Sequence, residues 1–132
     1  MDKTGKKTQN LEQALESLLD AIEEFDGSDY MRDAVIKRFE YTFELGWKLM
    51  QAILQDSGEG ELYGRRDIIR KAASRGLITQ EEAHDWLDLL EAKNLTSHTY
   101  NEDLAEEVSQ QARQLPKLAK SLLDKASSYK SE

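Results

Sequence analysis

The fold is decided by residues 31–54, which read MRDAVIKRFEYTFELGWKLMQAIL. Ser28 or Asp29 can cap the start of a helix here, and Gly58 ends it. The length of the run predicts the spine of a helical bundle. Its apolar residues recur at steps of three and four, the spacing of one face of an α-helix: Met31, Val35, Phe39, Phe43, Trp47, Met50 and Leu54.

A second apolar stripe lies on the same predicted helix and consists of Ala34, Ile36, Tyr41, Leu45 and Ile53. A helix that is apolar over more than one face is expected to contact several neighbouring helices or a second subunit. Core packing is the commoner explanation for such a stripe. We nevertheless predict a homodimer, because the helix carries apolar residues on more faces than one small bundle can cover. The interface should include part of Phe39 to Trp47 or the junction described below.

Helical periodicity continues on both sides of this spine. Upstream, Leu11 to Phe25 repeat at helical spacing until Asp26-Gly27. Downstream, a short helix around Ile68 to Ala73 stops at Gly76, which suits a left-handed C-terminal cap. Thr79 and Glu82 then have the spacing of a capping box, and the helix that they open loses its pattern near Lys93.

The last helix begins near Thr99 to Asn101 and keeps its period to Leu123, and Pro116 is expected to bend or divide it. Short loops between these helices favour an all-α fold, an antiparallel up-and-down four-helix bundle with one extra short helix. We place the bundle at residues 10–126. We expect residues 1–9 to be a flexible N-terminus and residues 127–132 a flexible tail.

Composition narrows the functional classes. The sequence of 132 residues contains no cysteine, which excludes disulfides and thiolate metal sites. Its N-terminus lacks an apolar signal region, and no run approaches the roughly 20 apolar residues of a membrane-spanning helix. We therefore expect a cytoplasmic protein without membrane contact.

The formal net charge of −8 repels a polyanion at long range, so contact with RNA would have to be local. One basic cluster shares a short predicted helix, and we interpret it first as a solvated surface. Its members are Arg65, Arg66, Arg70, Lys71 and Arg75.

Only two histidines are available for chemistry. Glu81 and His84 have the Glu-x-x-His spacing of carboxylate-bridged di-metal bundles, but the residue three before His98 is Leu95, so the set of ligands is incomplete. No phosphate-binding loop or dinucleotide fingerprint occurs. The sequence therefore predicts no metal site and no cofactor.

The densest polar segment is Lys93 to Asn101, at the junction of two predicted helices. An imidazole can exchange protons near neutral pH and a nearby cation can hold a phosphate, so the segment could support phosphodiester cleavage or nucleotide handling. On composition alone the structural interpretation is preferred, in which hydroxyl and amide groups cap helix ends and Tyr100 packs.

Five pieces of sequence occur in an order that resembles the nucleotidyltransferase substrate-binding protein family, a branch of the HEPN superfamily. The resemblance covers about residues 10 to 125. The pieces are Phe39 to Lys48, Arg66 with Ile69 and Ala72, Gly76 to Ile78, Trp86 with Leu87, and Lys93 to Asn101.

The resemblance implies a homodimeric helical bundle, similar to the helical domain of kanamycin nucleotidyltransferase, that works with a separately encoded minimal nucleotidyltransferase. In the related toxin branch the helical protein is a metal-independent ribonuclease with an Arg-x4-6-His motif. The nucleotidyltransferase silences it by adding AMP to a tyrosine two residues after the histidine. His98, Tyr100 and Asn94 match that pattern, whereas Lys93 stands at the arginine position. A lysine offers a point charge instead of a bidentate clamp.

Two functional hypotheses follow from these residues. In the first, the chain is the substrate-binding partner of a nucleotidyltransferase, and the junction lines a cleft with Thr96, Ser97, Thr99 and Asn101. In the second, the junctions of two subunits form a ribonuclease site, with RNA as the substrate. His98 would then be the general acid or base, Lys93 and Asn94 would bind phosphate, and Tyr100 would be the modification switch.

Overall fold

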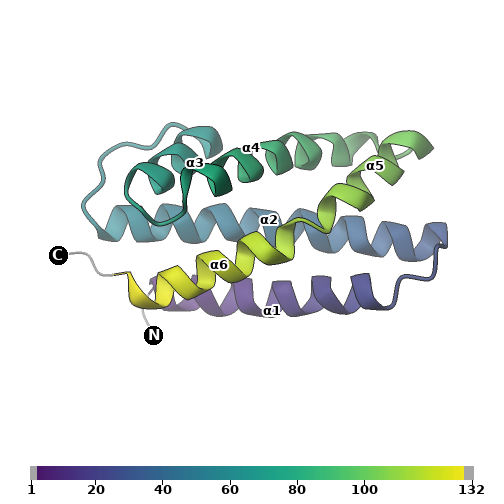
Figure 1. The fold of residues 1–132 in the computed structure, drawn as a ribbon, viewed down its shortest axis with the longest axis horizontal. Coiled ribbons are helices and arrows are strands. Elements are labelled where there is room, and N and C mark those ends of the chain that lie inside the picture. The colour runs from purple at the N-terminus through teal and green to yellow at the C-terminus, as the bar shows by residue number, and fades with distance from the viewer. Residues whose placement is uncertain (1–2, 130–132) are drawn as a thin grey trace.

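The computed structural model describes residues 3–129, and no strand occurs among them. The long elements α1, α2, α4 and the α5–α6 pair form a bundle, with α3 as the extra short helix (Figure 1). The predicted all-α bundle is confirmed. The elements in order are α1 (Lys3–Glu23), α2 (Asp29–Asp56), α3 (Arg65–Ser74), α4 (Gln80–Asn94), the 3-10 turn η1 (Leu95–His98), α5 (Glu102–Ala112) and α6 (Leu115–Ser128).

Helix α2 is the centre of the bundle, because it packs against α1, α3, α4, α5 and α6. Phe39 and Phe43 are fully buried between these helices. From the second stripe, Ile36 and Ile53 are also buried, which confirms the prediction of several neighbours. The other three members of that stripe keep part of their surface in solvent: Ala34, Tyr41 and Leu45.

The contact between α2 and α4 depends on Gly46. A Cβ atom at this position would lie 2.7 Å from Cη2 of Trp86, which is closer than real Cβ contacts. Trp86 is fully buried, and its ring centroid lies 5.6 Å from that of Phe43. Because Gly46 has no side chain, the indole fits against α2 and fixes the position of α4.

The predicted helix ends agree with the structure. The Ser28 hydroxyl accepts the Met31 amide at 3.1 Å, as an N-cap. Thr79 and Glu82 form the predicted capping box, in which each side chain accepts the other residue's amide, at 2.9 and 2.8 Å. Gly76 has φ of 79°, a left-handed conformation that glycine adopts without strain.

Both predicted edges of the bundle need correction. Helix α1 begins at Lys3, so residues 3–9 are helical although they lack an apolar pattern. Thr4 donates a hydrogen bond to the Asp56 carboxylate of α2, and Thr8 donates to the Thr4 carbonyl at 2.9 Å. At the other edge, α6 continues to Ser128 and Tyr129 packs against the core. Residues 1–2 and 130–132 lie outside the described part.

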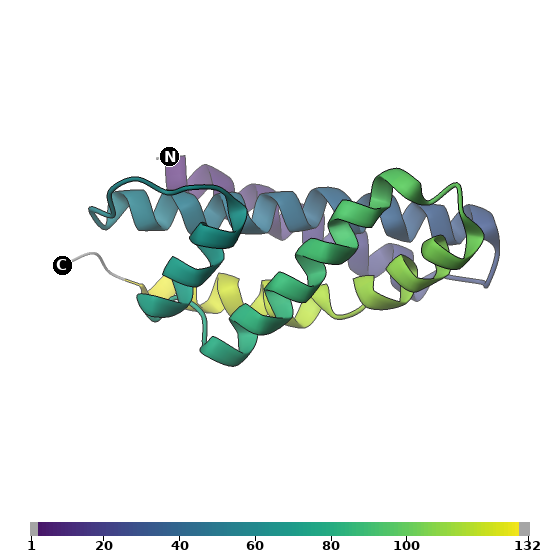
Figure 2. The ribbon, with the colours of Figure 1, turned by 90° about the horizontal axis from the view of Figure 1, so that it is seen from above.

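Pro116 divides the last helix, as predicted. Helix α5 ends at Ala112 and α6 begins at Leu115, so that Pro116 falls in the first turn of α6. Proline lacks an amide hydrogen and would clash with the carbonyl four residues earlier in a continuous helix, whereas the first turn tolerates it. The change of direction is visible in Figures 1 and 2. None of the described helices is long and apolar enough to span a membrane.

Candidate functional site

The junction between α4 and α5 is held by short-range hydrogen bonds. The hydroxyl of Thr96 donates to the Lys93 carbonyl at 2.7 Å, and that of Thr99 donates to the Thr96 carbonyl at 3.1 Å. Ser97 donates to the Asn94 carbonyl at 3.4 Å. These bonds satisfy carbonyl groups at the end of α4 and in η1. The hydroxyls therefore brace the backbone, which is the structural role considered in the sequence analysis.

Asn101 begins α5 as its N-cap, since its side-chain oxygen accepts the Leu104 amide at 3.2 Å. The two residues between η1 and this cap, Thr99 and Tyr100, form a tight turn. The turn projects Tyr100 into solvent, where its side chain is 83% exposed. A reagent or a partner protein can therefore reach the phenol.

His98 is also exposed and lies beside Tyr100. Their ring centroids are 6.1 Å apart and the rings meet edge-on at 74°. Among residues 3–129, no hydrogen bond or ion pair joins His98 to Lys93. The structure thus brings the histidine and the tyrosine of the predicted site together, but it keeps the lysine in a separate contact.

A shallow groove of about 370 Å³ lies next to the junction, and we call it the Tyr100 groove. Tyr100, Thr96 and Thr99 line one wall, and residues from the N-terminal half of α2 line the other. The α2 wall carries two carboxylates and one ammonium group. These lining residues are Asp33, Ile36, Lys37 and Glu40.

Lys93 is tied to α2. Its ammonium nitrogen lies 3.2 Å from a carboxylate oxygen of Glu44, and its side chain is only 17% exposed. The same carboxylate accepts the indole N–H of Trp47 at 2.9 Å and lies 3.3 Å from the guanidinium of Arg65. Glu44 therefore gathers two cations and an indole, and it neutralises the charge that a phosphate would need at Lys93.

Arg32 holds the start of α5 against α2. It is 3% exposed, and its guanidinium lies 2.7 Å from Glu102 and 3.3 Å from Glu106, both on α5. Asp29 and Asp33 of α2 each lie 3.3 Å away. The hydrogen bond with Glu102 raises the pKa of Arg32, and the same bond lowers the pKa of Glu102. This ionic contact positions the turn that carries Tyr100.

Neither Glu44 nor Arg32 was predicted from the sequence to position the junction. A buried charged residue requires a partner of opposite charge, but exposed charged residues occur on the same helix, so the sequence did not mark these two. The sequence did not identify that partner. Arg32 and Glu102 are 70 residues apart, and Lys93 lies on a different helix from Glu44.

The basic cluster on α3 is largely paired. Arg65 contacts Glu44, and Arg66 forms an ion pair with Glu91 of α4. Lys71 and Arg75 both contact Glu59, at 3.3 and 2.8 Å. With most of its charge neutralised, the cluster favours the surface interpretation over an RNA site.

His84 lies on the exposed face of α4, with Asp88 at 3.7 Å. No group of three or more potential ligands that could hold a metal ion occurs in the described residues.

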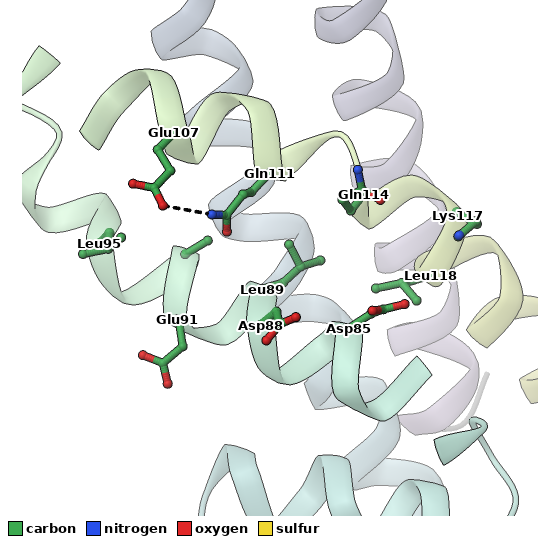
Figure 3. Close-up of a pocket in the computed structure, with 11 residues that line it drawn as sticks. Asp85, Asp88, Leu89, Glu91, Leu95, Glu107, Gln111, Gln114, Lys117 and Leu118 are labelled. Carbon is green, nitrogen blue, oxygen red and sulfur yellow. Dashed lines mark hydrogen bonds between the residues drawn. The ribbon is translucent and has the colours of Figure 1, made fainter. Parts of the chain in front are cut away.

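A deeper groove of about 480 Å³ separates α4 from the α5–α6 pair (Figure 3). Leu89 and Leu118 line its apolar part, and the carboxylates of Asp88, Glu91 and Glu107 stand along its rim. Carboxylates repel phosphate groups. Its lining holds four carboxylates and one ammonium group. The Tyr100 groove holds two carboxylates and one ammonium group and also contains the predicted tyrosine, so it is the better candidate site.

Comparisons with known proteins identify relatives of the chain. A probable ribonuclease HepT from Haemophilus influenzae is 33% identical over 81 residues, which cover 58% of this chain. The chain spans about half of that relative, since the match covers 54% of its length.

Two solved structures share the fold. A protein from Thermus thermophilus matches with a TM-score of 0.82 and 37% identity, over 88% of this chain and 98% of that one. A tri-AMPylated HEPN toxin from Shewanella oneidensis, in complex with MNT antitoxin, matches with a TM-score of 0.77 over 98% of this chain and 100% of that one. At 18% identity, the second match shows the fold alone.

Residues 6–128 match the family described as nucleotidyltransferase substrate binding protein like. The match includes the whole bundle core and the junction that carries Tyr100. The chain belongs to this nucleotidyltransferase substrate-binding-protein-like family.

Proposed function

We propose that the chain is the helical partner subunit of a minimal nucleotidyltransferase, that it acts as a homodimer, and that Tyr100 is its acceptor site for AMP. The observation that carries this proposal is the presentation of Tyr100. Its phenol is 83% exposed on a braced turn, beside a groove and an exposed imidazole. A partner enzyme can approach it without any rearrangement of the bundle.

The proposed reaction is a nucleotidyl transfer. The phenolic oxygen of Tyr100 attacks the α-phosphorus of ATP in the partner's active site, forms a new P–O bond and loses its proton, while pyrophosphate leaves. His98 is placed to influence that proton because its ring lies edge-on to the tyrosine. Relatedness to toxin–antitoxin proteins supports the proposal, since the Shewanella toxin of the same fold carries AMP and binds an antitoxin named MNT.

The test is co-expression with the nucleotidyltransferase encoded nearest to this chain, followed by intact-mass measurement. The expected result is a mass increase of one or more AMP units that disappears in Tyr100→Phe. Tyr30→Phe is the matched control, because Tyr30 is equally exposed at 83% and should leave the modification unchanged. Unmodified wild-type protein, or modification that survives Tyr100→Phe, would overturn the acceptor role.

A metal-independent ribonuclease is the second candidate, favoured by the exposed His98 beside Tyr100. In this function His98 is the general acid or base and Lys93 with Asn94 neutralises the phosphate. The ion pair between Lys93 and Glu44 argues against it, because the ammonium is already neutralised. For this reason we rank the partner-subunit function first.

Cleavage of total cellular RNA by the purified chain, without divalent metal and without the partner, separates the two candidates. If the chain is a ribonuclease, Lys93→Arg should increase cleavage, because a guanidinium can hold two phosphate oxygens. His98→Ala should lower it by about a hundredfold to ten-thousandfold. Equal inertness of all three proteins removes the ribonuclease candidate.

A further inference from the structure

The groove between α4 and the α5–α6 pair, which we call the acidic groove, has two walls of different chemistry (Figure 3). The α4 wall carries one carboxylate in each of three successive turns, from Asp85, Asp88 and Glu91. The facing wall carries the side-chain amides of Gln111 and Gln114. The α4 wall therefore offers negative charge along its length, opposite groups that can form uncharged hydrogen bonds.

Two charged residues complete the facing wall, at its opposite ends in Figure 3. Glu107 accepts a hydrogen bond from the amide nitrogen of Gln111 at 3.3 Å, which leaves the amide oxygen of Gln111 available as an acceptor. Within residues 3–129, Lys117 is the one cation that lines the groove. The lining thus holds four carboxylates against a single ammonium group, and it attracts a cation from outside.

Most of these carboxylates are not neutralised by the chain itself. Only Glu91 forms an ion pair with a lysine or arginine among residues 3–129, and its partner is Arg66 of α3. Asp88 lies 3.7 Å from His84, whose ring is charged only when it is protonated. An arginine of the chain therefore already contacts this rim at one carboxylate, and the other three can accept a cation from another molecule.

The floor of the groove is apolar. Leu89, Ala92 and Leu118 line it and are each no more than 2% exposed, and the half-buried Leu95 closes one end. Because so little of this floor reaches solvent, it cannot bury a bulky apolar side chain. It can cover the methylene stem of a long basic side chain, whose charged group then stays at the rim.

The groups at the rim favour a guanidinium over an ammonium. A guanidinium is planar and has five N–H donors, so that it can form two parallel hydrogen bonds with a carboxylate and still donate to an amide oxygen. An ammonium is a compact point charge without this geometry. Carboxylates on one wall and the amides of Gln111 and Gln114 on the other match the arginine side chain.

The length of the groove suits a short stretch of extended chain. The α4 wall rises about 15 Å from Asp85 to Leu95, which about five extended residues can span. In such a chain, alternate side chains lie on the same side, about 7 Å apart. This spacing falls between the axial rise from Asp85 to Asp88, about 4.5 Å, and that from Asp85 to Glu91, about 9 Å.

We infer that the acidic groove is a docking surface for an arginine-bearing segment of a partner protein, bound in an extended conformation with alternate arginines facing α4. The inference goes beyond the proposed function and does not depend on it, because the acidic groove and the Tyr100 groove share no lining residue. A second copy of this chain fits less well, since a two-fold contact through the groove would set its carboxylates against their own copies.

An NMR titration of the isotope-labelled chain tests this surface, with the blocked peptide Ac-Ala-Arg-Ala-Arg-Ala-NH2 as the probe. The expected shifts are confined to the groove and include the side-chain amides of Gln111 and Gln114. A peptide with citrulline in place of arginine keeps the shape but lacks the charge, and it should cause no shifts. The lysine peptide should bind several-fold more weakly. Absence of shifts with the arginine peptide, or equal binding of the citrulline peptide, would overturn the inference.

Paired variants separate the groove from the overall acidity of the chain. Asp85→Asn combined with Asp88→Asn should weaken binding of the arginine peptide about tenfold. Glu12→Gln combined with Glu16→Gln is the matched control, because it removes the same charge from exposed positions of α1 and should leave the affinity unchanged. Equal losses in the two double variants would show attraction to an acidic protein in general and would refute the docking surface.

Lys117→Gln provides a test in the opposite direction. Removal of the cation that lines the groove should strengthen binding of the arginine peptide about threefold, and weaker binding would contradict the inference. Spectra of the free chain over a dilution series complete the experiment. Groove signals that change on dilution would identify a second copy as the occupant and overturn the inference, whereas modification of Tyr100 is judged by its own mass measurement.

Discussion

The contact between α2 and α4 at Gly46 and Trp86 is apolar and fully buried, whereas the contact between α2 and α5 at Arg32 and Glu102 is ionic and reaches solvent on one side. The first contact positions α4 and the second positions α5, so both position the junction between these two helices. The buried contact should tolerate changes of pH and salt but no change of volume. The ionic contact should show the opposite sensitivity.

Among the variants considered, Trp86→Ala should have the largest effect on the buried contact between α2 and α4. Removal of a fully buried indole leaves a cavity, and we expect a loss of about 3–5 kcal/mol in the free energy of unfolding, measured by urea denaturation. Trp47→Ala serves as the control, because Trp47 is only partly buried and should cost less. Equal losses for the two variants would contradict the central role of Trp86.

Gly46→Ala tests the same contact by overpacking. The new methyl group would lie 2.7 Å from the indole, so we expect a net loss of about 1–3 kcal/mol, although alanine favours helix by about 1 kcal/mol relative to glycine. Gly60→Ala is the matched control, since nothing lies within 4 Å of its Cβ position. A Gly46→Ala protein that melts at or above the wild-type temperature would contradict this prediction. It would show that α2 and α4 can move apart with little loss of folding free energy.

Arg32→Met addresses the ionic side. The variant keeps the buried volume of the side-chain stem but removes the bonds to Glu102 and Glu106, and we expect a loss of about 1 kcal/mol because those carboxylates are largely exposed. Arg70→Met, at an exposed position of α3, should change the unfolding free energy little. An Arg32→Met loss as large as that of Trp86→Ala would abolish the contrast.

The pH dependence of the Arg32 contact follows from the lowered pKa of Glu102. Its folded-state pKa lies below the ordinary value of 4.5, so the stabilisation is present above pH 4.5 and is lost as the pH falls through the folded-state pKa. The stability gap between wild type and Arg32→Met should therefore shrink in acid. The gap between wild type and Gly46→Ala should stay constant over the same denaturation series.

Lys93→Gln should have the smallest effect. Its ion pair with Glu44 is partly screened by solvent, and pairs of this kind contribute up to about 1 kcal/mol. We also expect AMP transfer to Tyr100 to be unchanged, because Lys93 does not line the Tyr100 groove. Loss of transfer in a folded Lys93→Gln protein, measured by intact mass, would place the lysine in the acceptor site after all.

The sequence was sufficient to predict those features of the fold that depend on residues close together in the chain. Helical periodicity placed the core face of α2, the capping box at Thr79 opened α4, and Pro116 divided the last helix, because each feature depends on residues within a few positions. The polar start of α1 gave no such signal. There the structure shows a helix whose Thr4 contacts Asp56 on the neighbouring helix.

At the junction between α4 and α5, the sequence indicated which side chains are neighbours along the chain but not which contacts they make with other helices. The order of His98 and Tyr100 in the chain already implied that they are neighbours, and their rings are indeed adjacent. The pairing of Lys93 with Glu44 depends on how α4 packs against α2. That packing depends on a tertiary contact at Gly46, which no pattern within one helix reveals.

The central position of α2 also determines how the protein unfolds. Because α2 packs against α1, α3, α4, α5 and α6, no pair of helices can detach without exposing its buried face. Amide hydrogens at Phe39 and Phe43 should therefore exchange with deuterium only when the whole chain unfolds, and with one shared free energy of opening. Those of the turn around Tyr100 should exchange orders of magnitude sooner, because the turn is exposed at the edge of a bundle that opens only as a unit.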